Sequence, residues 1–381
     1  MYFTLVFTIY ESVTFMKRIQ ATKLIKKIFL CLTFFVTCPN IHRVIIQKNF
    51  LKKEIGHGIS TTLYAISKRS GIIERYKMFA SLMVAPITVG FGGSVGLQGP
   101  AVSTGAAIGS NVASMFHMNA KTRMLLIGCA TAGAMSSMFK APVAAIVFAV
   151  EIFSLDLVFT SLVPLLLASV AAVITSYFFR GTDVLFSFEL LDAWRVKDIV
   201  FYVFLGVATG IASVYFSKMY FLITRFFAWF SNAYVKIGIA ALAIGLMLYL
   251  FPPLYGEGYG LINNLLNGET EAALNGIQYQ IDFNNVWIVV AILLLIAVFK
   301  AIAMTTTFAA GGVGGIFIPT LFMGSALGNS VAKVINQFGF EVSESNFTLI
   351  GMTGLMAGVL HAPLTAIFLI AEITGGYDLF V

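Results

Sequence analysis

Charged side chains are scarce in this chain of 381 residues. Only 11% of its residues are Asp, Glu, Lys or Arg, and 59% are hydrophobic, whereas soluble domains carry about 25% charged residues. No acidic residue occurs between Glu74 and Glu151. Together with a mean hydropathy of +0.92, this scarcity excludes a soluble globular domain and predicts an all-α, polytopic membrane protein embedded in the lipid bilayer.

The near-uncharged stretches of the chain are long enough to span or re-enter a bilayer, which a run of roughly 20 apolar residues crosses once. Several stretches are short or interrupted by glycine and proline. Such irregular backbone is tolerated at membrane depth only where protein or a water-filled cavity surrounds it. The stretches are 79–116, 124–139, 157–179, 199–217, 236–254, 285–299, 301–333, 346–360 and 362–371.

Cysteine is also rare, and the sequence offers no metal or cofactor site. Cys31, Cys38 and Cys129 have no metal-ligand spacing, so we interpret them as small apolar side chains. No set of nucleophile and base is evident. The glycine-rich turns open apolar helices and do not follow a soluble strand, as a nucleotide-binding fingerprint requires. We therefore expect no enzymatic activity, no metal and no cofactor.

Positive charge is concentrated near the N-terminus. Thirteen of the 24 Lys and Arg residues lie between Lys17 and Lys77, and the net charge is +7. Apolar segments interrupt this run, which argues against a nucleic-acid partner and favours a cytoplasmic flank that obeys the positive-inside rule. Residues 23–38 resemble either a short membrane segment or a signal peptide. The pattern predicts a multi-pass protein of a bacterial-type inner (plasma) membrane.

Two glycine-rich turns, each closed by proline, repeat each other in the two halves of the chain. Residues 92–100 read GGSVGLQGP, and residues 311–319 read GGVGGIFIP. Broken helices duplicated in the two halves of a membrane protein are the best sequence pointer to a binding site near the bilayer midplane. A single register aligns Gly92 with Gly311, Gly93 with Gly312, Gly96 with Gly315, Pro100 with Pro319, Gly105 with Gly324 and Gly109 with Gly328.

A second pair of motifs follows each turn. Ala-Pro pairs at 141–142 and 362–363 open apolar runs, and Glu151 and Glu372 follow them at the same spacing. Proline is well tolerated in the first turn of a helix, so each pair predicts a helix start. We divide the chain into a divergent basic N-terminal segment (1–53), a first membrane repeat (54–180), an inter-repeat link with a helix (181–235) and a second, C-terminally truncated repeat (236–381).

Glycine at a helix start suits the binding of an anion. A helix N-terminus presents up to four unpaired N–H donors and the positive end of the macrodipole, which form an anion site without a charged side chain. Glycine lets the backbone turn sharply and approach the ion, and the absence of a full positive charge keeps binding weak enough for the ion to leave. The alternative is that the glycines only allow close helix packing. The duplication of the two turns favours the anion site.

These motifs resemble the CLC family of chloride channels and chloride/proton exchangers over roughly residues 54–381. Residues 314–319 match the family's GxFxP motif, and residues 96–100 match its G(K/R)EGP motif with two departures. Gly56, His57 and Gly58 look like a degraded GSGIP motif and would form the inner anion-site loop. The resemblance implies two inverted-topology repeats of tilted, broken helices. It also implies that backbone amides bind the anion. The amides of Ile316 and Phe317 would line the central anion site, and those of Leu97, Gln98 and Gly99 would line the outer anion site.

Two positions depart from the family pattern where proton chemistry is concerned. The resemblance places Gln98 at the position of the gating glutamate, and an amide neither ionises nor carries a proton. It places Ile152 at the position of the inner proton-relay glutamate, beside Glu151, which we interpret as a structural helix-end charge. In the sequence, no nearby acidic side chain replaces Gln98. His57, at the family's site serine, is either an anion ligand or a loop residue facing the cytoplasm.

We therefore predict a passive chloride channel of the voltage-gated CLC type, without proton coupling, that forms a homodimer. Chloride or a similar small anion is the expected permeant ligand. One alternative is a non-conducting, truncated remnant, because the family's last two helices and the tyrosine that touches the central anion would lie beyond Val381. The other alternative is a proton-coupled chloride or fluoride antiporter.

Overall fold

The computed structural model describes residues 58–154, 159–181, 186, 195–277 and 281–373. Over these residues the regular structure is helical, as the composition predicts. Residues 1–53, Gly56, His57, Cys31 and Cys38 lie outside the described part. The helices are α4 (Gly58–Lys68), α5 (Lys77–Gly90), α6 (Gln98–Met115), α7 (Ala120–Phe139), α8 (Pro142–Phe153), α9 (Phe159–Arg180), η2 (Val196–Asp198), α10 (Ile199–Ala228), α11 (Ala233–Leu250), η3 (Pro252–Leu254), α12 (Tyr259–Leu266), α13 (Thr270–Ala273), α14 (Val286–Ala309), α15 (Phe317–Gln337), α16 (Glu344–Leu360) and α17 (Pro363–Ile373).

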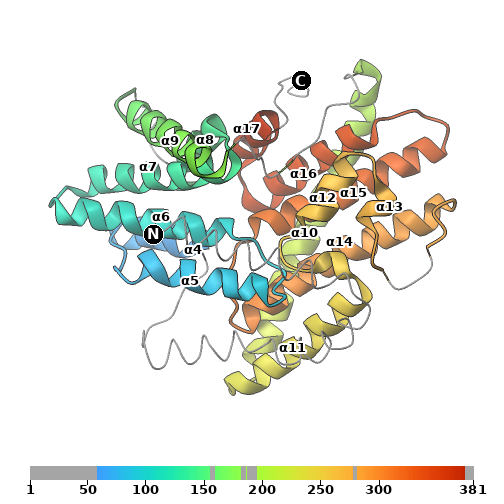
Figure 1. The fold of residues 1–381 in the computed structure, drawn as a ribbon, viewed down its shortest axis with the longest axis horizontal. Coiled ribbons are helices and arrows are strands. Elements are labelled where there is room, and N and C mark those ends of the chain that lie inside the picture. Colours follow the sequence, from blue (N-terminus) through green and yellow to red (C-terminus); the bar gives the residue numbers. More distant parts are fainter. Residues whose placement is uncertain (1–57, 155–158, 182–185, 187–194, 278–280, 374–381) are drawn as a thin grey trace.

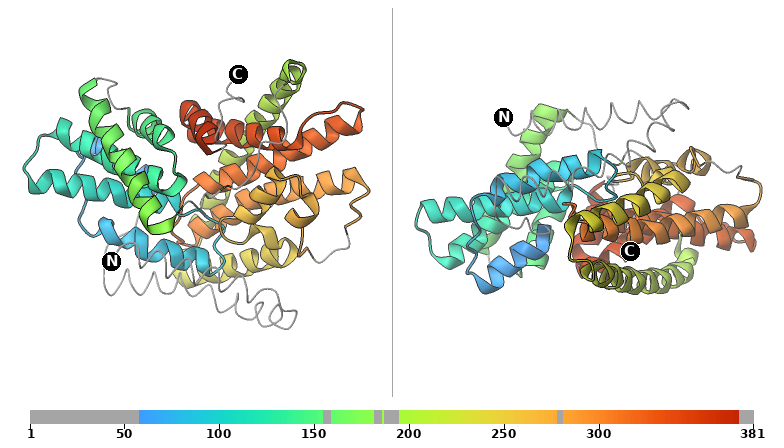
Figure 2. Two further views of the ribbon diagram at one scale, coloured as in Figure 1. Left: turned by 45° about the horizontal axis from the view of Figure 1, so that its top comes forward. Right: turned by 90° about the horizontal axis from the view of Figure 1, so that it is seen from below.

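Four of the described helices are long and apolar enough to cross a membrane, namely α9, α10, α11 and α14. The others are shorter or carry glycine and polar residues, as expected for a fold of broken helices. Figure 1 shows α4–α9 gathered on one side and α10–α16 on the other, with α17 beside α8 at their junction, and Figure 2 shows the same grouping from two other directions.

The predicted inter-repeat helix belongs with the second group. Helix α10 packs against α14 and α16, and α11 packs against α14. The predicted boundary at residue 236 falls inside α11, which begins at Ala233. Apolar periodicity indicates where a segment is helical but not which helices pack against it. The sequence-based division therefore placed α10 in the link and its packing partners α14 and α16 in the second repeat.

Paired glycines let α6 lie against α7, and α15 against α16. A Cβ added to Gly105 would lie 2.7 Å from the carbonyl oxygen of Ala130, and one added to Gly109 would overlap the Leu126 carbonyl oxygen. Their counterparts Gly324 and Gly328 meet the carbonyl groups of the next helix in the same way. For these glycines the helix-packing interpretation holds, since small residues let membrane helices approach closely.

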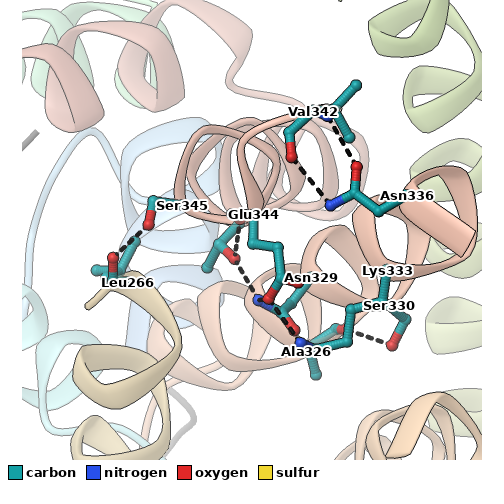
Figure 3. A network of polar contacts seen from close by, with 10 residues as sticks. Leu266, Ala326, Asn329, Ser330, Lys333, Asn336, Val342, Glu344 and Ser345 are labelled. Atoms are coloured by element: carbon teal, nitrogen blue, oxygen red, sulfur yellow. Dashed lines mark hydrogen bonds and ion pairs between the residues drawn. The ribbon is translucent and has the colours of Figure 1, made fainter. Parts of the chain in front are cut away.

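A polar network fixes α15, which carries the second turn, to its neighbours (Figure 3). The Nζ atom of Lys333 lies 2.6 Å from Oε2 of Glu344 at the start of α16. The side chain of Asn336 pairs with the backbone of Val342 in the connecting loop, through both its amide nitrogen and its oxygen. The hydroxyl of Ser345 donates to the carbonyl of Leu266 in α12. The contacts of Lys333 and Asn336 hold the end of α15 opposite to the turn, and the contact of Ser345 joins α16 to α12.

The two repeats are joined by reciprocal hydrogen bonds in which a glutamate of each repeat accepts from the start of the other repeat's Ala-Pro helix. Glu151 at the end of α8 accepts hydrogen bonds from the backbone N–H groups of Leu364 (3.1 Å) and Thr365 (2.8 Å) at the start of α17. Glu372 at the end of α17 accepts them from Val143 (3.0 Å) and Ala144 (2.7 Å) at the start of α8. Each glutamate therefore caps the other repeat's helix, which favours the structural interpretation of Glu151.

Removal of either cap is expected to weaken the fold. Glu151→Ala or Glu372→Ala leaves two helix-start N–H groups without their carboxylate, and a lost helix cap costs about 0.5–2 kcal/mol. We expect both variants to lower the midpoint of thermal unfolding, followed by fluorescence-detected size exclusion, while the exposed-site control Glu271→Ala leaves it unchanged. If Glu151→Gln instead altered proton movement at unchanged stability, Glu151 would have to be reassigned to proton transfer.

Candidate anion-binding site

The two glycine-rich turns contact each other backbone to backbone between the two helix groups. The N–H of Gly96 donates to the carbonyl of Gly315 at 3.0 Å, and the N–H of Gly315 donates to that of Gly96 at 2.7 Å. A Cβ on Gly315 would lie 2.6 Å from the Gly99 nitrogen, and a Cβ on Gly99 would lie 2.8 Å from Cα of Gly315. Glycine is required at these positions because the two turns lie in direct contact.

Two threonines connect the turns in a reciprocal way. The N–H of Ser94 donates to Oγ1 of Thr307 at 3.3 Å, and the N–H of Val313 donates to Oγ1 of Thr88 at 3.3 Å. Each threonine lies in the last turn of the helix before one glycine-rich turn and accepts from the other glycine-rich turn. This exchange shows that the two turns, aligned in the sequence by their glycines, are also equivalent in space.

Each turn leads directly into a helix whose N-cap residue makes no side-chain hydrogen bond of its own. Leu97 precedes α6 with φ −89° and ψ −9°, and Ile316 precedes α15 with φ −85° and ψ −12°. Neither residue makes a side-chain cap hydrogen bond, so both helix starts direct backbone donors to the region where the turns meet. Gly96 and Gly99 lie against Gly315, so the two helix starts that carry the predicted anion-binding amides lie side by side: Leu97, Gln98, Gly99, Ile316 and Phe317.

The remaining sequence-predicted positions are only partly placed. Gly58 opens α4 with φ +44°, and a Cβ there would lie 3.2 Å from the Gly99 backbone, so this end of the inner loop lies against the first turn. Gly56 and His57 lie outside the described residues. Ile152 is half-buried in α8 and packs against the hydrophobic core, so it offers no proton-carrying group at the relay position.

Gln98 is buried at the contact between the turns, with 1% of its surface exposed. Its Nε2 donates to the hydroxyl of Tyr259 at 2.7 Å and lies 3.4 Å from Oε1 of Glu257. Its Oε1 has no hydrogen-bond partner among the described residues. This oxygen lies against the first turn, since a Cβ on Gly96 would overlap it, and a buried polar atom without a partner is costly.

The expectation that no acidic side chain lies near Gln98 is wrong. Glu257 follows η3 and reaches the first turn, where its Oε1 accepts a hydrogen bond from the backbone N–H of Leu97 at 2.9 Å. Glu257 is 160 residues from Leu97 in the sequence, within the segment assigned to the second membrane repeat. The signal that could have identified it is the triplet GEG at 256–258, a carboxylate between two glycines in a chain poor in acid.

A buried lysine holds the loop that carries Glu257. Lys300 in α14 is fully buried, and its Nζ donates to the carbonyls of Gly256 at 2.7 Å and Leu254 at 3.4 Å. The ammonium also lies 4.6 Å from the centre of the Phe322 ring. Ionisable residues inside a membrane are expensive and mark functional sites. The sequence reasoning missed Lys300 because it only interrupts two apolar stretches.

Sequence and structure comparisons agree with these features. Over residues 35–381 the chain matches the family model described as voltage gated chloride channel. The chain therefore belongs to this family, the CLC proteins.

The chain is similar to both exchangers and channels. It is 28% identical over 303 residues to the H(+)/Cl(-) exchange transporter ClcA of Vibrio cholerae serotype O1 (strain M66-2), covering 77% of this chain and 61% of that relative. It is 26% identical over 313 residues to the voltage-gated ClC-type chloride channel ClcB of Salmonella typhimurium, covering 80% and 68%. The chain thus spans about three fifths of the length of the Vibrio exchanger.

Solved structures share the fold. A slow cyanobacterial Cl-/H+ antiporter superposes with a TM-score of 0.81 at 20% identity, over 98% of this chain and 86% of the antiporter. A CLC-type fluoride/proton antiporter gives a TM-score of 0.61 at 20% identity, over 92% and 89%. Because relatives named as exchangers and as channels both match this chain in sequence, the similarity alone does not distinguish a channel from an antiporter.

Proposed function

We propose that this chain conducts chloride or a similar small anion passively, without obligatory proton coupling. The observation that carries the proposal is that two helix starts meet at a site where the buried side chain is the amide of Gln98. Backbone amides at helix N-termini bind an anion without holding it as tightly as a full positive charge would. The amides of Leu97, Gln98 and Gly99 and those of Ile316 and Phe317 are the proposed ligands.

The absence of coupling follows from proton chemistry at two positions. Coupled exchange needs groups that take up a proton on one side and release it on the other. Gln98 does not ionise, and Ile152 carries no titratable group at the position implied for the second proton station. Without both stations, an anion that crosses has no fixed number of protons to accompany it.

Reconstitution into liposomes tests this proposal. We expect an outward chloride gradient to drive chloride efflux without uphill proton movement, with a reversal potential equal to the chloride equilibrium potential. The exchange transporter ClcA, reconstituted in parallel, provides the positive control for proton movement. Chloride efflux that drives protons uphill at a fixed ratio would contradict the passive channel.

A proton-coupled antiporter is the second candidate, and Glu257 is the observation that favours it, because it places one carboxylate at the first turn. The same assay separates the candidates, and competition between fluoride and chloride efflux reports the preferred anion. Protein-containing liposomes that release chloride no faster than empty ones would favour the third reading, a non-conducting remnant.

We further propose that the protein is a homodimer, with one pore in each subunit. The resemblance assigns the contact between subunits to segments that include α8, α9 and α17. Apolar side chains are exposed along α9, among them Leu166, Leu167, Ile174 and Phe178. A second copy of the chain would cover this face together with lipid.

A further inference from the structure

The carboxylate of Glu257 already occupies a donor of the proposed anion site. Its Oε1 lies 2.9 Å from the N–H of Leu97, the residue that caps the 18-residue helix α6. A carboxylate oxygen on a helix-start amide makes a charge-assisted hydrogen bond, which is about twice as strong as a neutral one. An anion that needs the same N–H must therefore displace this carboxylate.

The side chain of Gln98 completes the contact. Its Nε2 lies 3.4 Å from the same Oε1 of Glu257 and 2.7 Å from the Tyr259 hydroxyl. Its own oxygen is buried without a partner among the described residues. The amide of Gln98 thus donates toward the position of the carboxylate oxygen, and it would donate equally well to an anion in that position.

The backbone of the Glu257 loop is fixed, so movement is confined to the side chain. Gly256 and Gly258 have φ of +60° and +86°, conformations that favour glycine. A Cβ on Gly258 would overlap the Phe322 ring, and Lys300 binds the carbonyl of Gly256. The Glu257 carboxylate can leave Leu97 by rotation of its own torsions while the loop stays in place.

We propose that Glu257 is a carboxylate gate supplied to the first turn from the second half of the chain, in place of a titratable group at Gln98. This inference rests on the proposed anion conduction. In its charged form Glu257 competes with the anion for the N–H of Leu97 and repels it. In its protonated form it is a neutral and weaker acceptor, so the amides become available to the anion.

Other polar groups around Glu257 define the pH response. From α14, the ammonium of Lys300 attracts the carboxylate electrostatically. From α6 and α12, Gln98 and the Tyr259 hydroxyl form the hydrogen-bonded surroundings, and the hydroxyl of Tyr255 donates to the carbonyl of Gly90. Among these described groups, the carboxyl is that of Glu257. Its protonation removes a negative charge from the first turn. A fall in pH should therefore open the site to the anion.

Chloride efflux from liposomes of phosphatidylethanolamine and phosphatidylglycerol, measured between pH 4.5 and 7.5, tests the gate. Wild-type efflux should rise as the pH falls. Glu257→Gln should be faster than wild type at pH 7.5 by about tenfold or more, the effect of losing one hydrogen bond to a charged group, and should lose the acid activation. The matched control Glu271→Gln changes an exposed glutamate in helix α13 and should keep the wild-type profile.

A binding measurement separates failure of the gate from failure of conduction. Isothermal titration of chloride into the detergent-solubilised protein at pH 7.5 should show tighter binding to Glu257→Gln than to wild type. Tighter chloride binding to Glu257→Gln without any efflux would support the gate and overturn conduction. If wild type and Glu257→Gln showed the same efflux and the same pH profile, the gate would be overturned. If Glu257→Gln does not elute as a monodisperse protein, Glu257→Asp, whose shorter side chain retracts the carboxylate, should raise efflux at pH 7.5, and an unchanged rate would overturn the gate.

Discussion

Replacement of Gln98 by glutamate should slow anion flux at neutral pH by about tenfold or more, the scale of one added charge-assisted contact at the site, and should make it strongly acid-activated. The new carboxylate would be buried at the start of α6, where Nε2 of Gln98 now lies 3.4 Å from Oε1 of Glu257. Two carboxylates at this separation cannot both be charged at low cost, so the pair would share a proton. As the pH falls, protonation removes the charge that competes with the anion, and flux recovers.

Gln98→Glu should slow flux at neutral pH, whereas Glu257→Gln should raise it. Combining the two substitutions therefore provides a decisive test. Gln98→Glu combined with Glu257→Gln retains one carboxylate but moves it to the other side of the contact. We expect the double variant to regain an acid-activated profile with a single carboxyl, faster at neutral pH than Gln98→Glu alone. The measurement is chloride efflux from liposomes as a function of pH.

A control and a contrary outcome accompany this prediction. Gln337→Glu adds the same charge at an exposed residue at the far end of α15, and it should leave efflux and its pH profile unchanged. Equal, pH-independent efflux from wild type and Gln98→Glu would show that Gln98 does not lie on the anion path.

Lys300→Met should cause the largest loss of stability. The ammonium is fully buried and donates to the carbonyls of Gly256 and Leu254, and it is the opposite charge near Glu257. Methionine preserves the apolar stem but removes the donor to the buried Gly256 carbonyl and the counter-charge of one carboxylate, whereas the Leu254 carbonyl keeps its hydrogen bond from the Ser94 hydroxyl. Removing one partner of a buried charged pair costs about 3–5 kcal/mol. We expect a clear fall in the unfolding midpoint, because the loop carrying Glu257 is no longer held.

Fluorescence-detected thermal unfolding measures this effect, and Lys218→Met serves as the control. Lys218 is an exposed lysine in the apolar helix α10, so its replacement removes a charge without removing a buried contact. A midpoint for Lys300→Met within the range of this control would mean that the hydrogen bonds of Nζ do not fix the loop.

The glycine pattern illustrates how far a sequence can be interpreted. The register that aligns the two turns predicted correctly that they are equivalent, and the structure adds that Gly96 and Gly315 exchange backbone hydrogen bonds. The same register also contains Gly105 and Gly109, which serve helix packing against α7. Glycine satisfies both needs for one reason, the absence of a Cβ, so the sequence alone does not distinguish a ligand-binding turn from a close helix contact.

The Ala-Pro motifs show a comparable limit to what the sequence predicts. The Ala-Pro pairs and their glutamates predicted two equivalent helices, α8 and α17, and both form. That Glu151 and Glu372 cap each other's helices became visible only in the folded chain, since a carboxylate at a helix end has no local feature that names its partner.

By itself, the sequence determined the class of protein, the helical segments, the repeat and the two helix starts, because apolar runs, helix-start prolines and turn glycines act through neighbouring residues along the chain. Only the tertiary structure decided which carboxylate faces the first turn. Glu257 reaches Leu97 across 160 residues, and Lys300 fixes its loop from a third helix. Such contacts depend on how loops pack between helices, and no periodicity in the sequence records that packing.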